Sequence, residues 1–157
     1  MIHFTVPAIP IAQPRQRHRI IAAAGRQFVH NYTPTKSPVN AFKASVAAAA
    51  AAAYSGPPLA GPLSLSVVFV LPRPGNMIWK RRPMPRAWHA KKPDRDNLEK
   101  SLKDALSGRL WRDDAQVCSG NVEKWIAAGD EQPHVEVTVT TLEDSPTPAP
   151  AGETENP

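Results

Sequence analysis

The segment PLSLSVVFVLP, residues 62–72, limits the folds open to this chain more than any other feature. Its apolar side chains alternate with serines at first and then become continuous, and a proline stands at each end. A continuous apolar run of this length is typical of a strand that is buried on both faces within a sheet. The segment therefore predicts a central strand, around which the rest of the chain has to be arranged.

Two other segments predict helices. Ser37 and Pro38 form a helix start, with serine as the N-cap and proline at the first helical position. The alanine-rich run that follows favours a helix as far as residue 53. A second helix is expected over residues 96–107, where apolar side chains recur at spacings of four, seven and eight, and Gly108 should end it.

Alternating patterns predict the remaining strands. Residues 2–6 should form a half-buried strand, and residues 116–127 and 134–141 should form a hairpin around the sequence GDEQP. The order strand–helix–strand–loop–helix–strand–strand predicts an α/β fold of the mixed α+β type, in which a mixed sheet of about four strands carries two main helices. We expect a single small domain over residues 1–141. The proline-rich, acidic tail over residues 142–157 has no apolar periodicity and should be disordered.

Three features that the sequence lacks indicate the cellular compartment: a pair of cysteines, a signal peptide and a membrane-spanning segment. Cys118 is the only cysteine, so an internal disulfide is excluded. The first residues show no basic region followed by a long apolar run, so no signal peptide is indicated. The alanine-rich run is shorter than the roughly 20 apolar residues that a membrane helix needs. We therefore expect a cytoplasmic protein without membrane contact.

Charge is distributed very unevenly along the chain. Asp94 is the first acidic residue, and the 93 residues before it contain thirteen Lys or Arg. Residues 1–141 contain 19 basic and 10 acidic residues, so they carry a net charge of +9. Such a balance predicts a polyanionic partner, above all nucleic acid, although a solvated basic surface is the alternative. The cations expected to contact the DNA backbone are Arg15, Arg17, Arg19, Lys80, Arg81, Arg82, Arg86, Lys91 and Lys92.

Most of these cations lie in a long loop over residues 73–92, which holds seven Lys or Arg, no acid and two tryptophans. Long basic loops in compact domains are usually functional or disordered. Trp79 and Trp88 have two readings. They either pack on DNA, or they are buried in the core or in a dimer interface.

Two pairs of carboxylates interrupt the basic region. Asp94 and Asp96 follow a proline, and in an extended chain residues two apart project to the same side. The alternative for Asp96 is an N-cap at the start of the second helix. Asp113 and Asp114 follow that helix. A near-extended return from residue 109 would cover about the same 16 Å as the helix and bring the pairs together. The alternative is an ordinary polar turn.

A cluster of carboxylates requires a cation between them, because like charges at short range repel. Oxygen ligands alone suit Mg²⁺ or Mn²⁺. Lys100 lies one helical turn after Asp96 and would neutralise charge developing on a phosphate, whereas its alternative is a surface pair with Asp104. A metal-loaded acidic site within a basic surface is the electrostatic layout of a nuclease.

The stretch KPDRDNLEKSLKDALSGRLWRDDAQV, residues 92–117, closely resembles the signature of RusA-type Holliday junction resolvases. That signature runs Pro-Asp-x-Asp-Asn-Leu-x-Lys, then Asp-Ala-Leu, then Trp-x-Asp-Asp-x-Gln-Val. The segments PRQRHR and WKRRPMPRAWH are similar to those of phage and prophage members. The resemblance covers residues 2–141.

The resemblance implies a homodimeric endodeoxyribonuclease that binds four-way DNA junctions and nicks two strands symmetrically with Mg²⁺ or Mn²⁺. By motif, Asp94, Asp96 and Asp114 match the essential carboxylates and Lys100 matches the essential lysine. Asp113 matches a neighbouring acid and is included among the expected metal ligands. Two other functions stay open: a non-catalytic DNA-binding protein, and a nuclease of the same chemistry that acts on flaps or forks.

Overall fold

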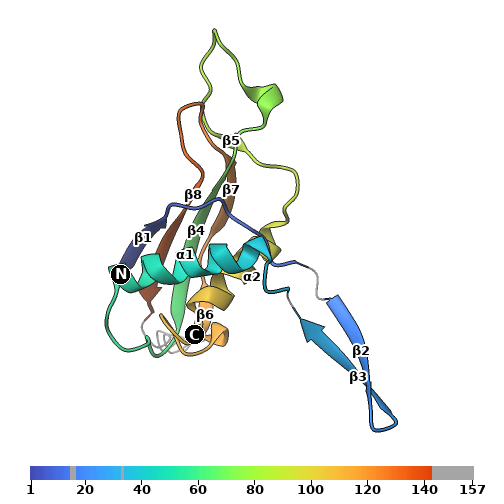
Figure 1. The fold of residues 1–157 in the computed structure, drawn as a ribbon. Helices are drawn as coiled ribbons and strands as arrows, with labels where there is room; N and C mark the ends of the chain where they lie inside the picture. The colour runs from blue at the N-terminus through green and yellow to red at the C-terminus, as the bar shows by residue number, and fades with distance from the viewer. Residues whose placement is uncertain (15–16, 33, 143–157) are drawn as a thin grey trace, which may run out of the picture.

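The computed structural model describes residues 1–14, 17–32 and 34–142 (Figure 1). In this part of the chain the main sheet has six strands, and two α-helices, α1 and α2, pack against it. The bounds are β1 (Ile2–Val6), α1 (Pro38–Ala53), β4 (Leu63–Leu71), β5 (Ala87–Trp88), α2 (Arg95–Leu106), β6 (Val117–Ser119), β7 (Val122–Ile126) and β8 (His134–Thr141). The predicted fold class, a mixed α+β domain with two helices on a mixed sheet, is confirmed.

The strand order is β1-β8-β4-β7-β5, and β6 also pairs with β4. β4 pairs antiparallel with β8 but parallel with β6 and β7, so the sheet is mixed and β4 is central, as predicted. The prediction of a hairpin over residues 116–141 is wrong, because β4 lies between β7 and β8 in the sheet. The sheet also has more strands than expected. β5 and β6 contain two and three residues, which is too short to show a period in the sequence.

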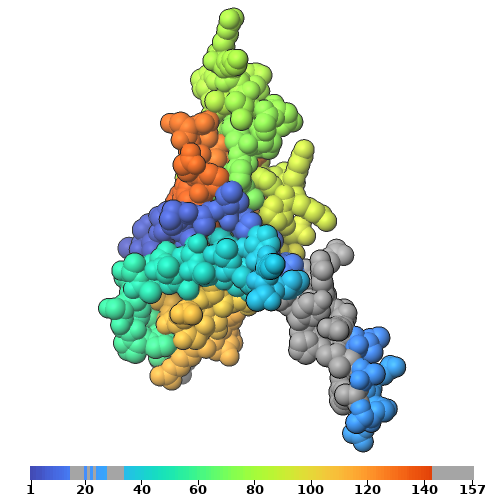
Figure 2. Space-filling view, in the orientation of Figure 1, coloured from blue at the N-terminus to red at the C-terminus, as the bar shows by residue number. Residues whose placement is uncertain are grey.

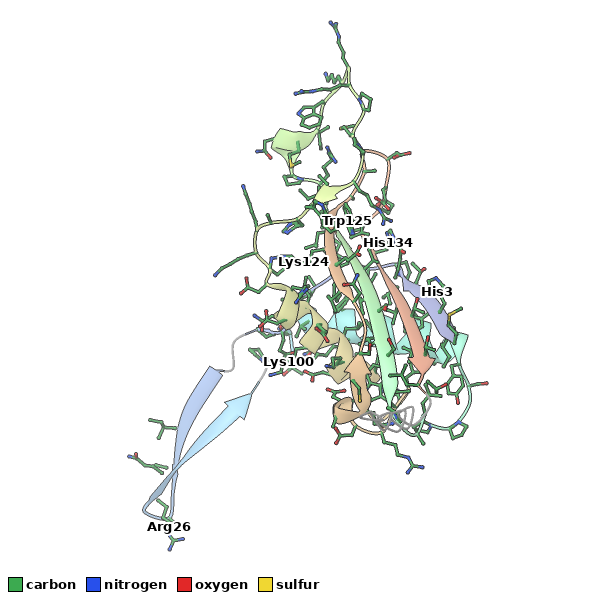
Figure 3. The ribbon with its side chains drawn as sticks, turned by 180° about the vertical axis from the view of Figure 1, so that it is seen from behind. His3, Arg26, Lys100, Lys124, Trp125 and His134 are labelled. Atoms are coloured by element: carbon green, nitrogen blue, oxygen red, sulfur yellow. The ribbon has the colours of Figure 1, made fainter. Side chains whose placement is uncertain are left out.

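The core lies on one face of the sheet, where alternate side chains of β4 are buried against both helices. Phe42 and Val46 of α1 and Leu98 and Leu102 of α2 point into this core. Both helices begin and end within two residues of the predicted limits. On the other face of β4 the side chains of Ser64, Ser66 and Val68 are only half-buried. Figure 3 shows this face, with the strands in front of α1.

A second, two-stranded sheet projects from the body of the molecule (Figures 1 and 2). It consists of β2 (Arg17–Ala23) and β3 (Arg26–Tyr32), which pair antiparallel over seven residues each. Ala24 and Gly25 both have positive φ, 51° and 75°, as a two-residue hairpin turn requires. Pro14 and the basic residues that follow it predict a loop over residues 14–19. That expectation is wrong from residue 17 onwards, because an Ala-Gly turn is a weak hairpin signal.

Two predictions concern the ends and the environment of the chain. From residue 143 the predicted disordered tail lies outside the described residues. Within the described residues no helix has the length and apolar character needed to cross a membrane.

Candidate active site

Asp94 and Asp96 lie at the N-terminal end of α2, and both are exposed. Asp94 occupies the N-cap position in an extended conformation, with φ −71° and ψ 142°, yet its side chain makes no capping hydrogen bond. Asp96 lies in the first turn, so its alternative reading as the N-cap is wrong. The carboxylate of Asp94 is therefore not used to hold the helix start. The partial positive charge of the helix end favours anions here.

The segment that leads into Asp94 is fastened to the sheet by Lys124 of β7. Its Nζ donates to the carbonyl oxygens of Lys91 at 2.8 Å and of Pro93 at 2.6 Å. The backbone N–H of His89 donates to the carbonyl of Lys124 at 3.1 Å. Lys91 and Lys92 remain exposed beside Asp94. Two free cations and a free carboxylate are thus held on one short, anchored segment.

The chain that leads into the projecting hairpin is fastened to the same half of α2. The backbone N–H of Gln13 donates to the carbonyl of Asn97 at 2.9 Å. Ser101 is fully buried, and its Oγ donates to the carbonyl of Ile11 at 2.6 Å. The hairpin therefore departs from the body close to the two acids. Arg17 and Arg19 lie on β2, whereas Arg15 is outside the described residues.

The second pair, Asp113 and Asp114, does not return to the first. The chain turns tightly at the end of α2, where the N–H of Gly108 donates to the carbonyl of Trp111 at 2.7 Å. Asp113 then caps a short 3₁₀ helix (Asp114–Gln116), and its Oδ1 accepts from the N–H of Ala115 at 2.7 Å. The expected extended return along the helix is therefore wrong. β6 and β7 make that return instead.

The carboxylate of Asp114 is used within this turn. Its Oδ1 accepts from the indole Nε1–H of Trp111 at 2.8 Å, and Trp111 is fully buried. The two acidic pairs are consequently separated by α2, whose 12 residues span about 18 Å.

A metal site made of all four carboxylates does not fit within one chain. Among the described residues no three His, Cys, Asp or Glu side chains come close enough together to hold a metal ion. The sequence-based expectation of a complete acidic cluster in the folded monomer is thus not met. Two separate groups, of two carboxylates each, are present.

Lys100 is exposed on α2 (Figure 3). The surface pair with Asp104 that was its alternative is not formed, because Asp104 pairs with Lys43 of α1 at 3.3 Å. Lys103, three residues further on, pairs with Glu99 at 3.4 Å. α2 therefore carries one lysine that is bound to a carboxylate of its own helix and one that extends into solvent one turn from Asp96.

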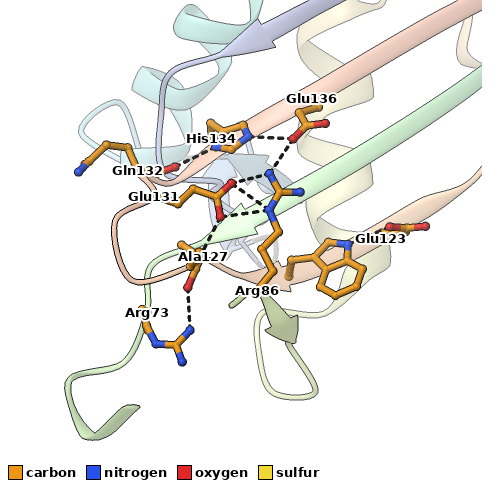
Figure 4. A network of polar contacts seen from close by, with 10 residues as sticks. Arg73, Arg86, Glu123, Ala127, Glu131, Gln132, His134 and Glu136 are labelled. Carbon is orange, nitrogen blue, oxygen red and sulfur yellow. Dashed lines mark hydrogen bonds and ion pairs between the residues drawn. The ribbon is translucent and has the colours of Figure 1, made fainter. Parts of the chain in front are cut away.

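Arg86 is held in a network of polar contacts rather than extended into solvent (Figure 4). Its Nε donates to Glu131 at 2.9 Å and its Nη2 donates to Glu136 at 2.9 Å. Glu136 also contacts His134 at 3.0 Å. The hydrogen bond to Glu131 raises the pKa of Arg86, and the same bond lowers the pKa of Glu131. Arg86 thus fixes the basic loop to the end of the sheet, and this structural use competes with its predicted contact to DNA.

Arg73 anchors the same loop, and sequence reasoning missed it. Its guanidinium donates to the carbonyls of Met77, Pro85 and Ala127 at 2.9, 3.0 and 3.0 Å. Arg73 and Arg82 lie over the ring of Trp79, at 5.2 and 4.2 Å from its centroid. No local signal distinguishes an anchoring arginine from a free one.

The tip of the loop carries the cations that remain exposed, Lys80, Arg81 and Arg82. With Lys91 and Lys92 they form two exposed basic groups, one on the anchored loop and one beside Asp94. These five are the described side chains among the predicted DNA contacts that the fold leaves exposed.

Comparison with known proteins agrees with this layout. The family model of the endodeoxyribonuclease RusA matches residues 7–140, which include both ends of α2 and the whole basic loop. The uncharacterized protein YqaN of Bacillus subtilis (strain 168) is 34% identical over 143 residues, which are 88% of this chain and 94% of that protein. The chain therefore belongs to the RusA family of endodeoxyribonucleases.

Proposed function

We propose that this protein is a structure-selective endodeoxyribonuclease that resolves four-way DNA junctions by hydrolysing phosphodiester bonds. One observation carries the proposal: Asp94 and Asp96 are exposed at the start of α2, and the side chain of Asp94 is not used as a cap. Lys91, Lys92 and Lys100 surround them with free positive charge. Exposed carboxylates inside a basic surface suit chemistry on a phosphate backbone.

The cations have two roles in this proposal. Lys80, Arg81, Arg82, Lys91 and Lys92 bind backbone phosphates, so affinity should fall steeply with added salt. Lys100 stabilises negative charge at the phosphate under attack, because a fixed cation near developing charge lowers the barrier. We expect products with 5′-phosphate and 3′-hydroxyl ends.

We propose that cleavage depends on Mg²⁺ or Mn²⁺, on the basis of family membership. Such an ion supplies an activated water and neutralises phosphate charge. The four carboxylates do not meet within one chain, and this separation bears on the oligomeric state. A second copy whose turn at Asp113 and Asp114 lies against the first copy's Asp94 and Asp96 would unite the two groups. A homodimer also matches the two-fold symmetry of a junction.

The substrate is tested by incubating the protein with a labelled synthetic four-way junction, a flap, a fork and a linear duplex. Each is tested with Mg²⁺, Mn²⁺, Ca²⁺ and EDTA. We expect paired symmetric nicks in the junction with Mg²⁺ or Mn²⁺ and none in EDTA. Tight junction binding without cutting under any condition would indicate a non-catalytic DNA-binding protein. Preferred cutting of the flap or the fork would keep the chemistry and change the substrate.

The homodimer is tested by mixing two inactive variants, Asp96→Asn and Asp114→Asn. If the groups meet across a dimer, a mixed dimer restores one intact site, and the mixture nicks one strand of the junction. If each chain acts alone, the mixture stays as inactive as its components. Size-exclusion chromatography with light scattering measures the mass of both variants, so that a loss of association is not mistaken for a loss of chemistry.

A further inference from the structure

Trp88 and Trp125 form an aromatic pair at the edge of the main sheet. They lie directly opposite each other in the β5–β7 ladder, with ring centroids 3.7 Å apart and ring planes inclined by 23°. Trp125 is half-buried, and its Nε1 donates to Glu123 at 2.8 Å. Trp88 is 64% exposed although one of its faces is covered by Trp125. The opposite face of Trp88 is therefore open to solvent, so the first reading of this residue, contact with DNA, remains open.

Trp88 borders a hollow of about 360 Å³, which Arg95 at the start of α2 also lines. Trp88 forms one wall, and Arg95 and Lys124 form others. Arg95 stands between Asp94 and Asp96 in the sequence, and Lys124 is the residue that fastens Pro93. Figure 3 shows Trp125 and Lys124 together at the upper end of β7. An open aromatic plane and a guanidinium thus line one hollow, and Arg95 joins it along the chain to Asp94 and Asp96.

The chemistry of this hollow matches one nucleotide. Every nucleobase has an apolar π-face that stacks on aromatic side chains, and the phosphate of the same nucleotide is attracted to a cation. We propose that Trp88 stacks on an unpaired nucleobase of the DNA next to the phosphate that is cut, while Arg95 contacts the adjoining backbone. This inference rests on the proposed function and adds a base-binding subsite to it. Unpaired bases are available at a branch point, whereas a continuous duplex keeps its bases stacked.

Binding without cleavage tests the subsite. In EDTA, a single-stranded oligothymidine should quench the tryptophan fluorescence of the wild-type protein. Trp88→Ala should lose most of that quenching and bind the oligonucleotide and the junction about tenfold more weakly, as expected when one stacked base is lost. Trp88→Phe should restore most of the affinity. Ile78→Ala is the matched control, because Ile78 is a 60% exposed apolar residue of the same basic loop and does not line the hollow.

A junction with abasic nucleotides at the branch point separates base stacking from other effects. The wild-type protein should bind it about as weakly as Trp88→Ala binds the intact junction. Equal affinity of wild type and Trp88→Ala for the intact junction would overturn the proposal. A change from dimer to monomer in Trp88→Ala, with no change in quenching, would overturn it in favour of a contact with a second copy.

These outcomes are independent of cleavage. A protein that cuts no branched DNA but shows Trp88-dependent quenching refutes the proposed function and leaves the subsite intact. A protein that resolves junctions equally well with and without Trp88 supports the proposed function and refutes the base-binding subsite.

Discussion

The two ends of α2 carry the same kind of side chain in opposite states. At the N-terminal end Asp94 and Asp96 are exposed, and the carboxylate of Asp94 makes no capping bond. At the C-terminal end Asp113 caps a 3₁₀ helix and Asp114 accepts a hydrogen bond from the buried Trp111. Both pairs lie within residues 92–117, the stretch that resembles the RusA signature. The structure therefore separates acids available for chemistry from acids that also maintain the fold.

The basic side chains show the same division. Arg86 is bound to Glu131 and Glu136, whereas Lys80, at the tip of the same loop, is exposed. Lys103 is bound to Glu99, whereas Lys100 on the same helix extends into solvent. In each case a group that is already paired stabilises the structure, and a free group is available for DNA.

Among the basic side chains, the largest effect is expected for Lys100→Ala. Cleavage of the junction should slow by about 100-fold, the usual loss when a group that stabilises transition-state charge is removed. The free energy of unfolding should not change, because Lys100 has an exposed side chain. Lys103→Ala is the matched control and should cut at a rate close to wild type. Single-turnover kinetics and urea unfolding measure the two quantities, and equal rates for both variants would break the contrast.

Substitutions of Arg86 and Lys80 should affect different quantities. Loss of Arg86 should lower the free energy of unfolding, and loss of Lys80 should weaken binding to DNA. Arg86→Ala should lower the free energy of unfolding by about 2 kcal/mol, because two part-buried carboxylates lose their charged donor. Lys80→Ala should leave stability unchanged and reduce the slope of log affinity against log salt by about 1 if it contacts one phosphate. Urea unfolding and DNA binding at several salt concentrations test both. The opposite assignment of effects would show that Arg86 is the DNA contact.

Substitution of an acid should affect the free energy of unfolding differently at the two ends of α2. Asp114→Ala should cost about 1–2 kcal/mol, because the buried indole N–H of Trp111 loses its acceptor. Asp94→Ala should change the free energy of unfolding by less than about 0.5 kcal/mol, the usual range for exposed positions. Urea unfolding of both variants makes the comparison. A large loss in Asp94→Ala would mean that the first pair is structural as well.

The smallest expected effect is a loss of stability at low pH. Hydrogen bonds from Arg86 lower the pKa of Glu131, and the pKa of Glu136 is also lowered, since bonds from His134 and Arg86 outweigh its burial. A carboxyl group whose folded pKa is depressed stabilises the protein above its ordinary pKa of 4.5 and loses that contribution as the pH falls. Each partly exposed carboxylate should contribute less than about 1 kcal/mol. Unfolding measured between pH 7 and pH 3 should show this loss in wild type and a smaller loss in Arg86→Ala.

Much of the fold was predictable because its signals are local. The N-cap and proline at Ser37 and Pro38, the apolar face of α2 and the long apolar strand β4 each identify an element from neighbouring residues. The strand order was not predictable in this way. β4 inserts between β7 and β8 through pairings across many residues, whereas the sequence between β7 and β8 alone favours a hairpin.

The candidate site shows the same difference between local signals and contacts that form only in the folded chain. Asp94, Asp96 and Lys100 could be proposed from the sequence because they occur within one short motif. The state of Asp114 depends on an indole N–H that reaches it only after the chain turns at Gly108. Arg86 could not be told from Lys80, because its partner Glu131 lies 45 positions away. Local spacing thus indicated the candidate acids, while contacts that form only on folding decide which charged groups are free.

The most direct test of this account is the cleavage of a four-way junction by Asp96→Asn in Mg²⁺, beside wild type and Asp104→Asn. Asp104 lies on the same helix and pairs with Lys43, so it controls for the loss of a carboxylate from α2. We predict that wild type and Asp104→Asn produce paired nicks, and that Asp96→Asn binds the junction and does not cut it. Full cleavage by Asp96→Asn would contradict the assignment of the N-terminal end of α2 as the catalytic site.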